Sequence, residues 1–340
     1  MPECNLMSNI KDISALTGLS LATISRVFNN SPLVSPKTKQ KVLDAAKQLD
    51  YRPNISAAAL RSGKSRIIGV LVPEIKSSFF GEIINGIEKK MKNWGYNIII
   101  AQSHESEELE KEVLESFMQL NVDGVLISIA KETANLSEIQ KIVGKKTPIV
   151  FFDRMPNLDT ASSVVLDDYI GARIATKHLI DEGCKNIVHI AGNLQVSIFK
   201  ERKRGFEDAM TKNGLQLNSH NVIELSTDIR SNKLMIDQLL EKYPTIDGFF
   251  AHADVYGLYV LDILKNKNIQ VPLQVKLVGF GNSEFTAHVT PNLTSIDQNC
   301  YQMGVLAAET LINHINSKKP IVSKQVLDPK LIIRTSSKSI

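Results

Sequence analysis

The stretch that decides the fold is Ile10 to Asn29, IKDISALTGLSLATISRVFN, which has the pattern of two short helices joined by a tight turn. Apolar residues recur within it at helical spacing, namely Ile13, Leu16, Leu19, Ile24 and Val27. We expect these residues to bury one face of each helix. Gly18 can take the left-handed conformation that ends the first helix, and Ser20 can cap the second. The stretch therefore predicts a helix–turn–helix unit.

The second of these helices, Leu21 to Phe28, is the candidate DNA reader. It begins with small or apolar residues and carries Arg26 one turn further on. Such a helix can enter the major groove with its first turn against base edges and its arginine within reach of a guanine. The expected DNA contacts here are Ser20, Leu21, Ala22, Thr23, Ser25, Arg26 and Asn29. Read alone, the pattern also fits an ordinary two-helix corner.

The next segment, Val34 to Asn54, predicts a third helix that closes a small domain. Ser35 stands at the N-cap position and Pro36 at the first helical position. The helix is amphipathic through Val42, Leu43, Ala46 and Leu49. Three helices can then enclose one small core.

Positive charge is concentrated at the front of the 340-residue chain. Residues 1–66 hold ten Lys or Arg and four Asp or Glu, a net charge of +6. The other 274 residues hold thirty basic and thirty-two acidic side chains, a net of −2. An excess of this kind beside a candidate reader favours binding to a phosphate backbone, since cationic side chains release its counterions.

From Ile10 to about Val72 the sequence resembles the lactose-repressor/galactose-repressor family of bacterial regulators. The matching motifs are IKDI, LS-ATISRVFNN, VS-KT---VL-AA--L-YRPN and IGVLVPE. The resemblance implies a DNA-binding headpiece over residues 1–53, a hinge helix and linker over 54–66, and a two-lobed effector-binding and dimerisation domain over 67–340. It implies a homodimeric regulator, most simply a repressor, that reads a palindromic operator in double-stranded DNA.

The segment Asn54 to Arg66, NISAAALRSGKSR, matches the hinge helix of that family. The resemblance implies that this helix orders on operator DNA and wedges Leu60 into the minor groove, which kinks the duplex. The family usually has an arginine or glutamine where Ala58 stands. A plain tether is the alternative. The further DNA contacts expected from the resemblance are Ser35, Thr38, Asn54, Ala57 and Leu60.

From Ile67 the pattern changes to short β-branched runs that alternate with amphipathic segments, which is typical of βαβ units and parallel sheets. In a first lobe we expect strands at 67–72, 97–101, 124–128 and 148–152 and helices at 80–94, 107–120 and 137–143. In a second lobe we expect strands at 186–190, 222–225, 248–251 and 275–280 and helices at 170–182, 200–213, 232–243 and 255–267. The pair Val122-Asp123-Gly124 and Ile246-Asp247-Gly248 suggests that the two lobes repeat one plan.

After residue 280 we expect the chain to return to the first lobe through 293–297 and a helix at 301–315. It would then cross back for the last strands, 324–327 and 331–333. The fold class predicted for the whole chain is α/β: a three-helix headpiece followed by a two-lobed core like that of type I periplasmic binding proteins. In that fold, ligands bind between the lobes at the carboxyl ends of the strands.

The resemblance selects the effector-site candidates Phe79, Phe80, Asp153, Arg202, Thr227 and Asp254, and Lys200 is added because it lies close to Arg202 in the sequence. The aromatic pair, placed in the loop after the first strand, can lie against a sugar or base, and Arg202 can donate a bidentate fork. Phe80 is equally suited to a core position, and Asp153 and Asp254 to capping turns. The family commonly has an acidic residue where Gly281 stands and an asparagine or serine where Ala253 stands. With both anchors missing and Lys200 near Arg202, we expect a small sugar-like effector, preferably an anionic one.

Other classes of protein find little support. The sequence has no P-loop, dinucleotide fingerprint, nucleophile elbow or HExxH motif, so we expect no enzyme activity, no cofactor and no metal. The three cysteines are isolated, and there is neither a membrane-length apolar run nor a secretory signal, which predicts a cytoplasmic protein without membrane contact. Two alternatives stay open: a DNA-binding regulator controlled by a protein corepressor, and a solute-binding protein of the same two-lobed fold.

Overall fold

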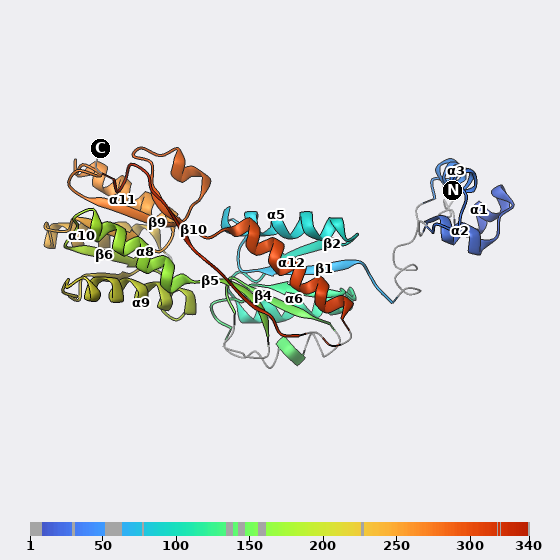
Figure 1. Cartoon of the computed structure of the whole chain (residues 1–340), viewed down its shortest axis with the longest axis horizontal. Helices are drawn as coiled ribbons and strands as arrows, with labels where there is room; N and C mark the ends of the chain where they lie inside the picture. Colours follow the sequence, from blue (N-terminus) through green and yellow to red (C-terminus); the bar gives the residue numbers. More distant parts are fainter. Residues whose placement is uncertain are drawn as a thin grey trace, which may run out of the picture. The chain divides into compact units, whose positions relative to one another are not determined.

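The computed structural model describes residues 9–28, 31–51, 63–76, 78–133, 139–141, 147–155, 161–225, 228–317, 319 and 321–338. The chain forms two compact units, Met1–Ser65 and Arg66–Ile340, and each is considered by itself (Figure 1). No helix in the described part of the chain is both long enough and apolar enough to cross a membrane.

In its described residues the first unit is a three-helix domain, as expected. It contains α1 (Ile10–Thr17), α2 (Leu21–Phe28) and α3 (Pro36–Gln48). Gly18 ends α1 with φ of 70°, in the left-handed region where glycine carries no Cβ penalty. The buried side chains of its core are Ile13, Ile24, Val27, Val42, Ala45 and Ala46.

Two apolar residues assigned to this core are exposed. Leu16 is 47% exposed and Leu43 is 40% exposed, while their neighbours Thr17 and Ala45 take the buried positions. Thr17 can be buried because its hydroxyl donates to the carbonyl oxygen of Ile13 over 2.6 Å, which satisfies the polar group inside the core. A pattern that counts only apolar residues therefore identified most of this core but assigned Leu16 and Leu43 to it in error.

The second unit contains two six-stranded sheets, one in each lobe. The first sheet has the order β11-β5-β4-β3-β1-β2 with all described pairings parallel, and the second has the order β12-β10-β9-β8-β6-β7. The strands of the first sheet are β1 (Ile67–Val72), β2 (Asn97–Gln102), β3 (Gly124–Ile127), β4 (Ile149–Phe152), β5 (Ser162–Leu166) and β11 (Lys324–Leu327). Those of the second are β6 (Ile187–Ala191), β7 (Val222–Glu224), β8 (Gly248–Ala251), β9 (Lys276–Gly281), β10 (Thr294–Asp297) and β12 (Lys330–Ile332).

Helices cover both faces of each sheet (Figure 1). The helices of the first lobe are α5 (Ser78–Asn93), α6 (Glu107–Gln119) and α12 (Cys300–Asn316). Those of the second are α8 (Asp168–Asp181), α9 (Ser197–Lys212), α10 (Ile229–Lys242) and α11 (Asp254–Asn266), with a short 3-10 helix η1 (Glu284–Ala287). One apolar cluster extends from the face under α5 and α12 to the face under α8 and α9, whereas the opposite face of each sheet has a cluster of its own.

The last part of the chain differs from the expected path. Residues 293–297 do not return to the first lobe, because β10 pairs in parallel with β9 in the second sheet. The crossing follows β10, and α12 then packs on α5. β11 stays in the first lobe beside β5, and only β12 crosses back, antiparallel to β10. Short buried runs carry no signal for which sheet they join. Strand β5 was not predicted, and the helix expected at 137–143 falls mostly outside the described residues.

The repeated Asp-Gly pair holds the same position in both lobes. Asp123 precedes β3 and accepts a hydrogen bond from the backbone N–H of Arg66 over 3.1 Å, just before β1. Asp247 precedes β8 and accepts from the N–H groups of Lys185 and Asn186 over 2.8 and 2.9 Å, just before β6. Each carboxylate thereby fixes the start of the strand beside its own, which confirms that the lobes repeat one plan.

Close helix contacts depend on glycine. A Cβ added to Gly86 in α5 would lie on the carbonyl oxygen of Tyr301, and one added to Gly304 in α12 would lie on that of Ile83. Gly205 in α9 meets the carbonyl oxygen of Tyr169 in the same way. The two helices of each pair can pack this closely only because these positions lack side chains.

We predict that Gly86→Ala lowers the free energy of unfolding by about 1–3 kcal/mol, because the methyl group forces α5 away from α12. The matched control is Gly81→Ala on the same helix, where the added Cβ would meet nothing within 4 Å. That variant should gain about 0.5–1 kcal/mol from the lower backbone entropy of alanine. Urea unfolding of both variants checks the pair, and equal effects would contradict the close contact.

Candidate functional site

The outer face of α2 has the composition of a DNA reader. Leu21, Ala22 and Arg26 are exposed and Ser25 is half-buried, whereas Ile24 and Val27 on the opposite face are buried in the three-helix core. The hydroxyl of Ser20 accepts a hydrogen bond from the backbone N–H of Thr23 over 3.2 Å. The helix is therefore capped at the end that carries the expected base contacts, and its exposed side chains project away from the core.

The first turn of α3 repeats this arrangement. Ser35 caps the helix by accepting from the N–H of Thr38 over 3.2 Å, and the hydroxyl groups of the two residues lie 2.9 Å apart. The corresponding hydroxyl groups of Ser20 and Thr23 are also 2.9 Å apart. Helix N-termini with neighbouring hydroxyl donors are suited to phosphate oxygens, so α2 and α3 each offer one candidate backbone contact.

Several predicted site residues lie outside the described part of the chain. They are Asn29, Asn54, Ala57, Leu60 and Thr227. The hinge contacts and the wedge at Leu60 therefore remain predictions from the resemblance.

We predict that Arg26→Ala weakens specific operator binding by about 1–3 kcal/mol and relaxes the choice of base at one position, since an exposed arginine in the groove can bind a guanine edge. Lys185→Ala is the control, because it removes one exposed positive charge from the other compact unit. Binding to a library of mutated operator sites gives both quantities. An unchanged base preference in Arg26→Ala would contradict this role.

The candidate effector site is a cavity of about 240 Å³ where the chain first passes from one lobe to the other. It lies at the carboxyl ends of β4 and β5 in the first lobe and against the first turn of α9 in the second. Loops converge at such a position in parallel sheets. The described residues that line it are Asp153, Met155, Val165, Leu166, Asp167, Asp168, Tyr169, Ser197, Ile198, Glu201 and Val326.

Arg202 is held directly beside this cavity and is only 3% exposed. Its Nε donates to Asp168 over 2.7 Å, one terminal nitrogen donates to the carbonyl oxygen of His252 over 2.5 Å, and the other donates to Gln298 over 3.3 Å. The guanidinium carbon lies 3.7 Å from the centre of the Phe280 ring. Arg202 thus joins α9 to the segment that enters α8 and to the segment that enters α12.

Asp153 and Asp168 are the two buried carboxylates of the cavity. Burial raises the pKa of Asp153, and the nearby Arg154 and Arg202 partly oppose this shift. Burial raises the pKa of Asp168 to about 6, against the lowering effect of its partner Arg202. Asp153 has φ of 58°, a left-handed conformation that is strained for a residue other than glycine. Strained backbone and buried charge are both typical of ligand sites.

The other effector candidates are placed differently. Phe79 and Phe80 lie in the first turn of α5 and not in a loop, and Phe80 is part of the core. Lys200 is exposed and does not line the cavity. Asp254 accepts from the hydroxyl of Ser295 over 2.6 Å and from the N–H of Ser283 over 2.8 Å, both within the second lobe. Of the expected residues, the structure brings Asp153 and Arg202 together.

Asp167, Asp168 and Glu201 line the cavity but were not predicted from the sequence. A signal was present, because Asp167 and Asp168 directly follow the β-branched run that forms β5. That strand was not predicted, so its carboxyl end was not searched for polar residues. Asp167 also caps α8 by accepting from the N–H of Ile170 over 2.9 Å.

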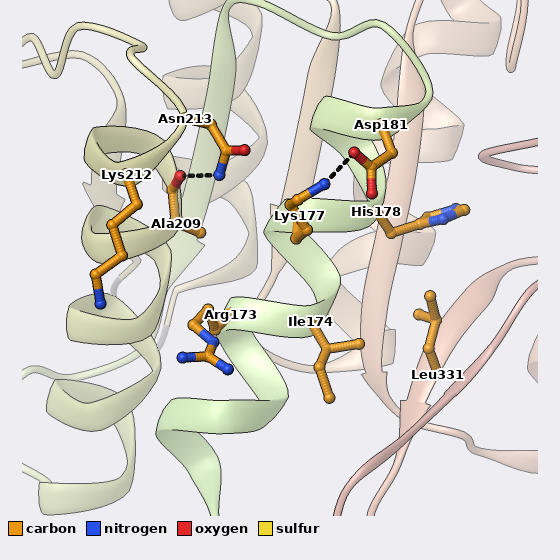
Figure 2. A pocket seen from close by; sticks show the side chains of 9 residues that line it. All are labelled: Arg173, Ile174, Lys177, His178, Asp181, Ala209, Lys212, Asn213 and Leu331. Atoms are coloured by element: carbon orange, nitrogen blue, oxygen red, sulfur yellow. Dashed lines mark hydrogen bonds and ion pairs between the residues drawn. The ribbon is translucent and has the colours of Figure 1, made fainter.

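A larger cavity of about 490 Å³ lies elsewhere on the second lobe, beside α8, α9 and β12 (Figure 2). None of the predicted site residues lines it. Figure 2 shows that Lys177 and Asp181 on its wall bind each other along α8, and that Asn213 binds back to Ala209 in the last turn of α9. Its polar groups mostly satisfy their own helices, so we take the smaller cavity as the candidate site. In the described part of the chain, no group of three or more His, Cys, Asp or Glu residues could hold a metal ion.

Comparison with known families gives two matches that together cover most of the chain. Residues 9–54 match the family described as bacterial regulatory proteins, lacI family. Residues 65–332 match the family described as periplasmic binding proteins and sugar binding domain of LacI family. The boundary between the two matches agrees with the boundary between the compact units.

Individual proteins are similar over nearly the whole length. The ribose operon repressor of Halalkalibacterium halodurans is 30% identical over 332 residues, which cover 98% of each chain. The solved structure of a transcriptional regulator CelR–cellobiose complex is 27% identical with a TM-score of 0.74, covering 97% of this chain and 99% of that one. The lac repressor dimer bound to operator and the anti-inducer ONPF has a TM-score of 0.86 at 21% identity, covering 98% and 99%, and supports the fold.

Proposed function

We propose that this chain, which belongs to the LacI family of bacterial regulatory proteins, binds a sugar-like effector in the inter-lobe cavity. The bound effector controls the affinity of the protein for operator DNA. The protein is a DNA-binding transcriptional regulator. The observation that carries the proposal is that one chain joins a capped reader helix with an exposed face to a cavity between two lobes. We propose that it acts as a repressor in the cytoplasm and catalyses no reaction.

Sugars are favoured as the class of effector by the names of similar proteins, a ribose operon repressor and a regulator solved with cellobiose. The cavity has a volume of about 240 Å³ and its described lining contains four carboxylates. Carboxylates accept hydrogen bonds from hydroxyl groups, as a polyol requires.

The preference for an anionic effector that we stated from the sequence is not supported. No Lys, Arg or His is among the described lining residues, and Lys200 is exposed. The fork of Arg202 is already occupied by Asp168, His252 and Gln298. An added anion would face buried carboxylates, which is unfavourable at low dielectric. We therefore propose an effector without negative charge.

A dimer follows from the geometry of reading DNA. One headpiece contacts few bases, so two copies should read the halves of an inverted repeat. Closure of the lobes on an effector would shift the paired subunits and change whether both headpieces fit one operator. A protein corepressor remains the alternative for control, and a solute-binding protein is disfavoured by the match at residues 9–54.

The test is a melting screen of the purified protein against sugars and sugar derivatives, followed by operator binding with each ligand found. A ligand specific to the folded state adds roughly 2.7 kcal/mol of stability at a hundred times its dissociation constant. We expect at least one sugar-like molecule to do so and to change operator affinity. If none does while a protein partner changes operator affinity, the small-effector proposal fails.

Asp153→Asn provides the site-specific arm of this test. Loss of its buried carboxylate should lower the affinity for the ligand by about tenfold, which is the scale of one charge-assisted hydrogen bond. At a fixed ligand concentration, the ratio of operator affinities with and without ligand should then move toward one. Asp181→Asn is the matched control, because it removes an exposed carboxylate from the same compact unit at the other cavity. Arg202→Ala is a poorer choice, since it would leave Asp168 buried without its partner.

A further inference from the structure

Two buried carboxylates present oxygens without a hydrogen-bond partner to the same cavity. Oδ2 of Asp153 accepts from the hydroxyl of Ser128 over 3.1 Å, and Oδ1 of Asp168 accepts from Arg202 over 2.7 Å. Within the described residues, no donor is bound to Oδ1 of Asp153 or to Oδ2 of Asp168. Both residues line the cavity, and each is 7% exposed. Neither oxygen is among the fully enclosed side-chain atoms that lack a partner in the described part of the chain, so each is open to a donor from the cavity.

The charges around these two groups do not balance. Arg154 is bound by both oxygens of Glu105, over 3.0 and 2.7 Å, and its Nε is 3.9 Å from Asp153. Arg202 is bound by Asp168. Among the described residues beside the cavity, two guanidinium groups thus neutralise two of the three carboxylates Glu105, Asp153 and Asp168. One negative charge is left in excess.

The two other carboxylates that line the cavity do not reduce this excess of negative charge. Asp167 is held by the N-terminus of α8, and Glu201 is paired at the surface with Arg204. The excess negative charge affects the pKa of Asp168. Burial raises this pKa to about 6, and the negative charge of Asp153 acts in the same direction. The negative charge of Glu105 likewise adds to burial in raising the pKa of Asp153.

We infer that the effector carries one positive charge, as in an amino sugar or another aminated polyol, and that its ammonium group lies between Asp153 and Asp168. This inference rests on the proposed function of the cavity. An ammonium group has three donors and no acceptor, so it can bind both unpartnered oxygens and restore neutrality at once. A hydroxyl group can donate to only one of them and leaves the charge unbalanced. Binding of the cation should in turn favour the ionised form of both carboxylates.

Binding of an aminated ligand should depend on pH in a defined sense. The groups that face the two carboxylates are Glu105 after β2, Arg154 after β4, Asp167 before α8, Arg202 in α9 and Cys300 in α12. Burial raises the pKa of the Cys300 thiol to about 12, so it stays neutral. Asp168, with its pKa raised to about 6, is ionised above that value and gains a proton below it. Affinity for the ammonium form of a ligand should therefore be highest well above pH 6, as long as the amine stays protonated, and should fall as the pH decreases through about 6.

The experiment uses the full chain and matched ligand pairs in calorimetric titrations. Glucosamine is compared with glucose, galactosamine with galactose, and 1-amino-1-deoxysorbitol with sorbitol. N-acetylglucosamine, whose nitrogen carries no charge, is included as a further probe. One of these pairs should have the ring or chain that fits the cavity. In that pair, the aminated ligand should bind at least about tenfold more tightly than its neutral parent. This ratio should shrink at about pH 5, where Asp168 is protonated.

Asp153→Asn should reduce the ratio between aminated and neutral ligand, whereas Asp181→Asn at the other cavity should leave it unchanged. If a neutral sugar binds as tightly as its aminated partner and alters operator affinity, the charge inference is overturned while the proposed function stands. If neither kind of sugar binds, both fail. Because the wild-type ratios and their pH dependence need no variant, poor folding of Asp153→Asn would not remove the test.

Discussion

Arg202 places a guanidinium group that is 3% exposed at the point where two segments pass between the lobes. A buried charge is tolerated there because the guanidinium group donates hydrogen bonds to Asp168, to the carbonyl oxygen of His252 and to Gln298. It also lies over the face of the Phe280 ring. Asp168 begins α8 just after the chain leaves β5, and Gln298 follows β10 just before α12. The same side chain therefore fixes the entry into each lobe, and the cavity forms beside it.

The repeat of one plan in both lobes explains why the site lies where it does. Asp123 and Asp247 hold equivalent strand starts, and glycines allow the helix pairs α5–α12 and α8–α9 to pack closely. The carboxyl ends of the parallel strands in both sheets can then converge on the crossing segments. With the strands fixed on either side, a shift between the lobes must be taken up by these few segments, and a ligand that contacts both lobes can bias it.

Much of this architecture could be predicted from the sequence, because long periodic segments and capping residues are local signals. Gly18, Ser20 and Ser35 were placed correctly on that basis. The buried Thr17, the strand β5 and the sheet to which β10 belongs were not predicted, since each depends on a partner distant in sequence or on a satisfied hydroxyl group. Arg202 was identified, but its role was not, because only the fold reveals that Asp168 occupies its fork. The resemblance singled out Asp153 and Arg202, whereas the excess of negative charge beside the cavity could be found only from the folded structure.

Coupling between cavity and reader is the centre of this account, and it must be reciprocal in binding free energy. The direct measurement is a closed thermodynamic cycle with one ligand from the screen and one operator duplex. Operator affinity is measured with and without saturating ligand, and ligand affinity with and without saturating operator. The account predicts that both ratios differ from one and equal each other. Ligand that binds the cavity with the same affinity in the presence and absence of operator would contradict it.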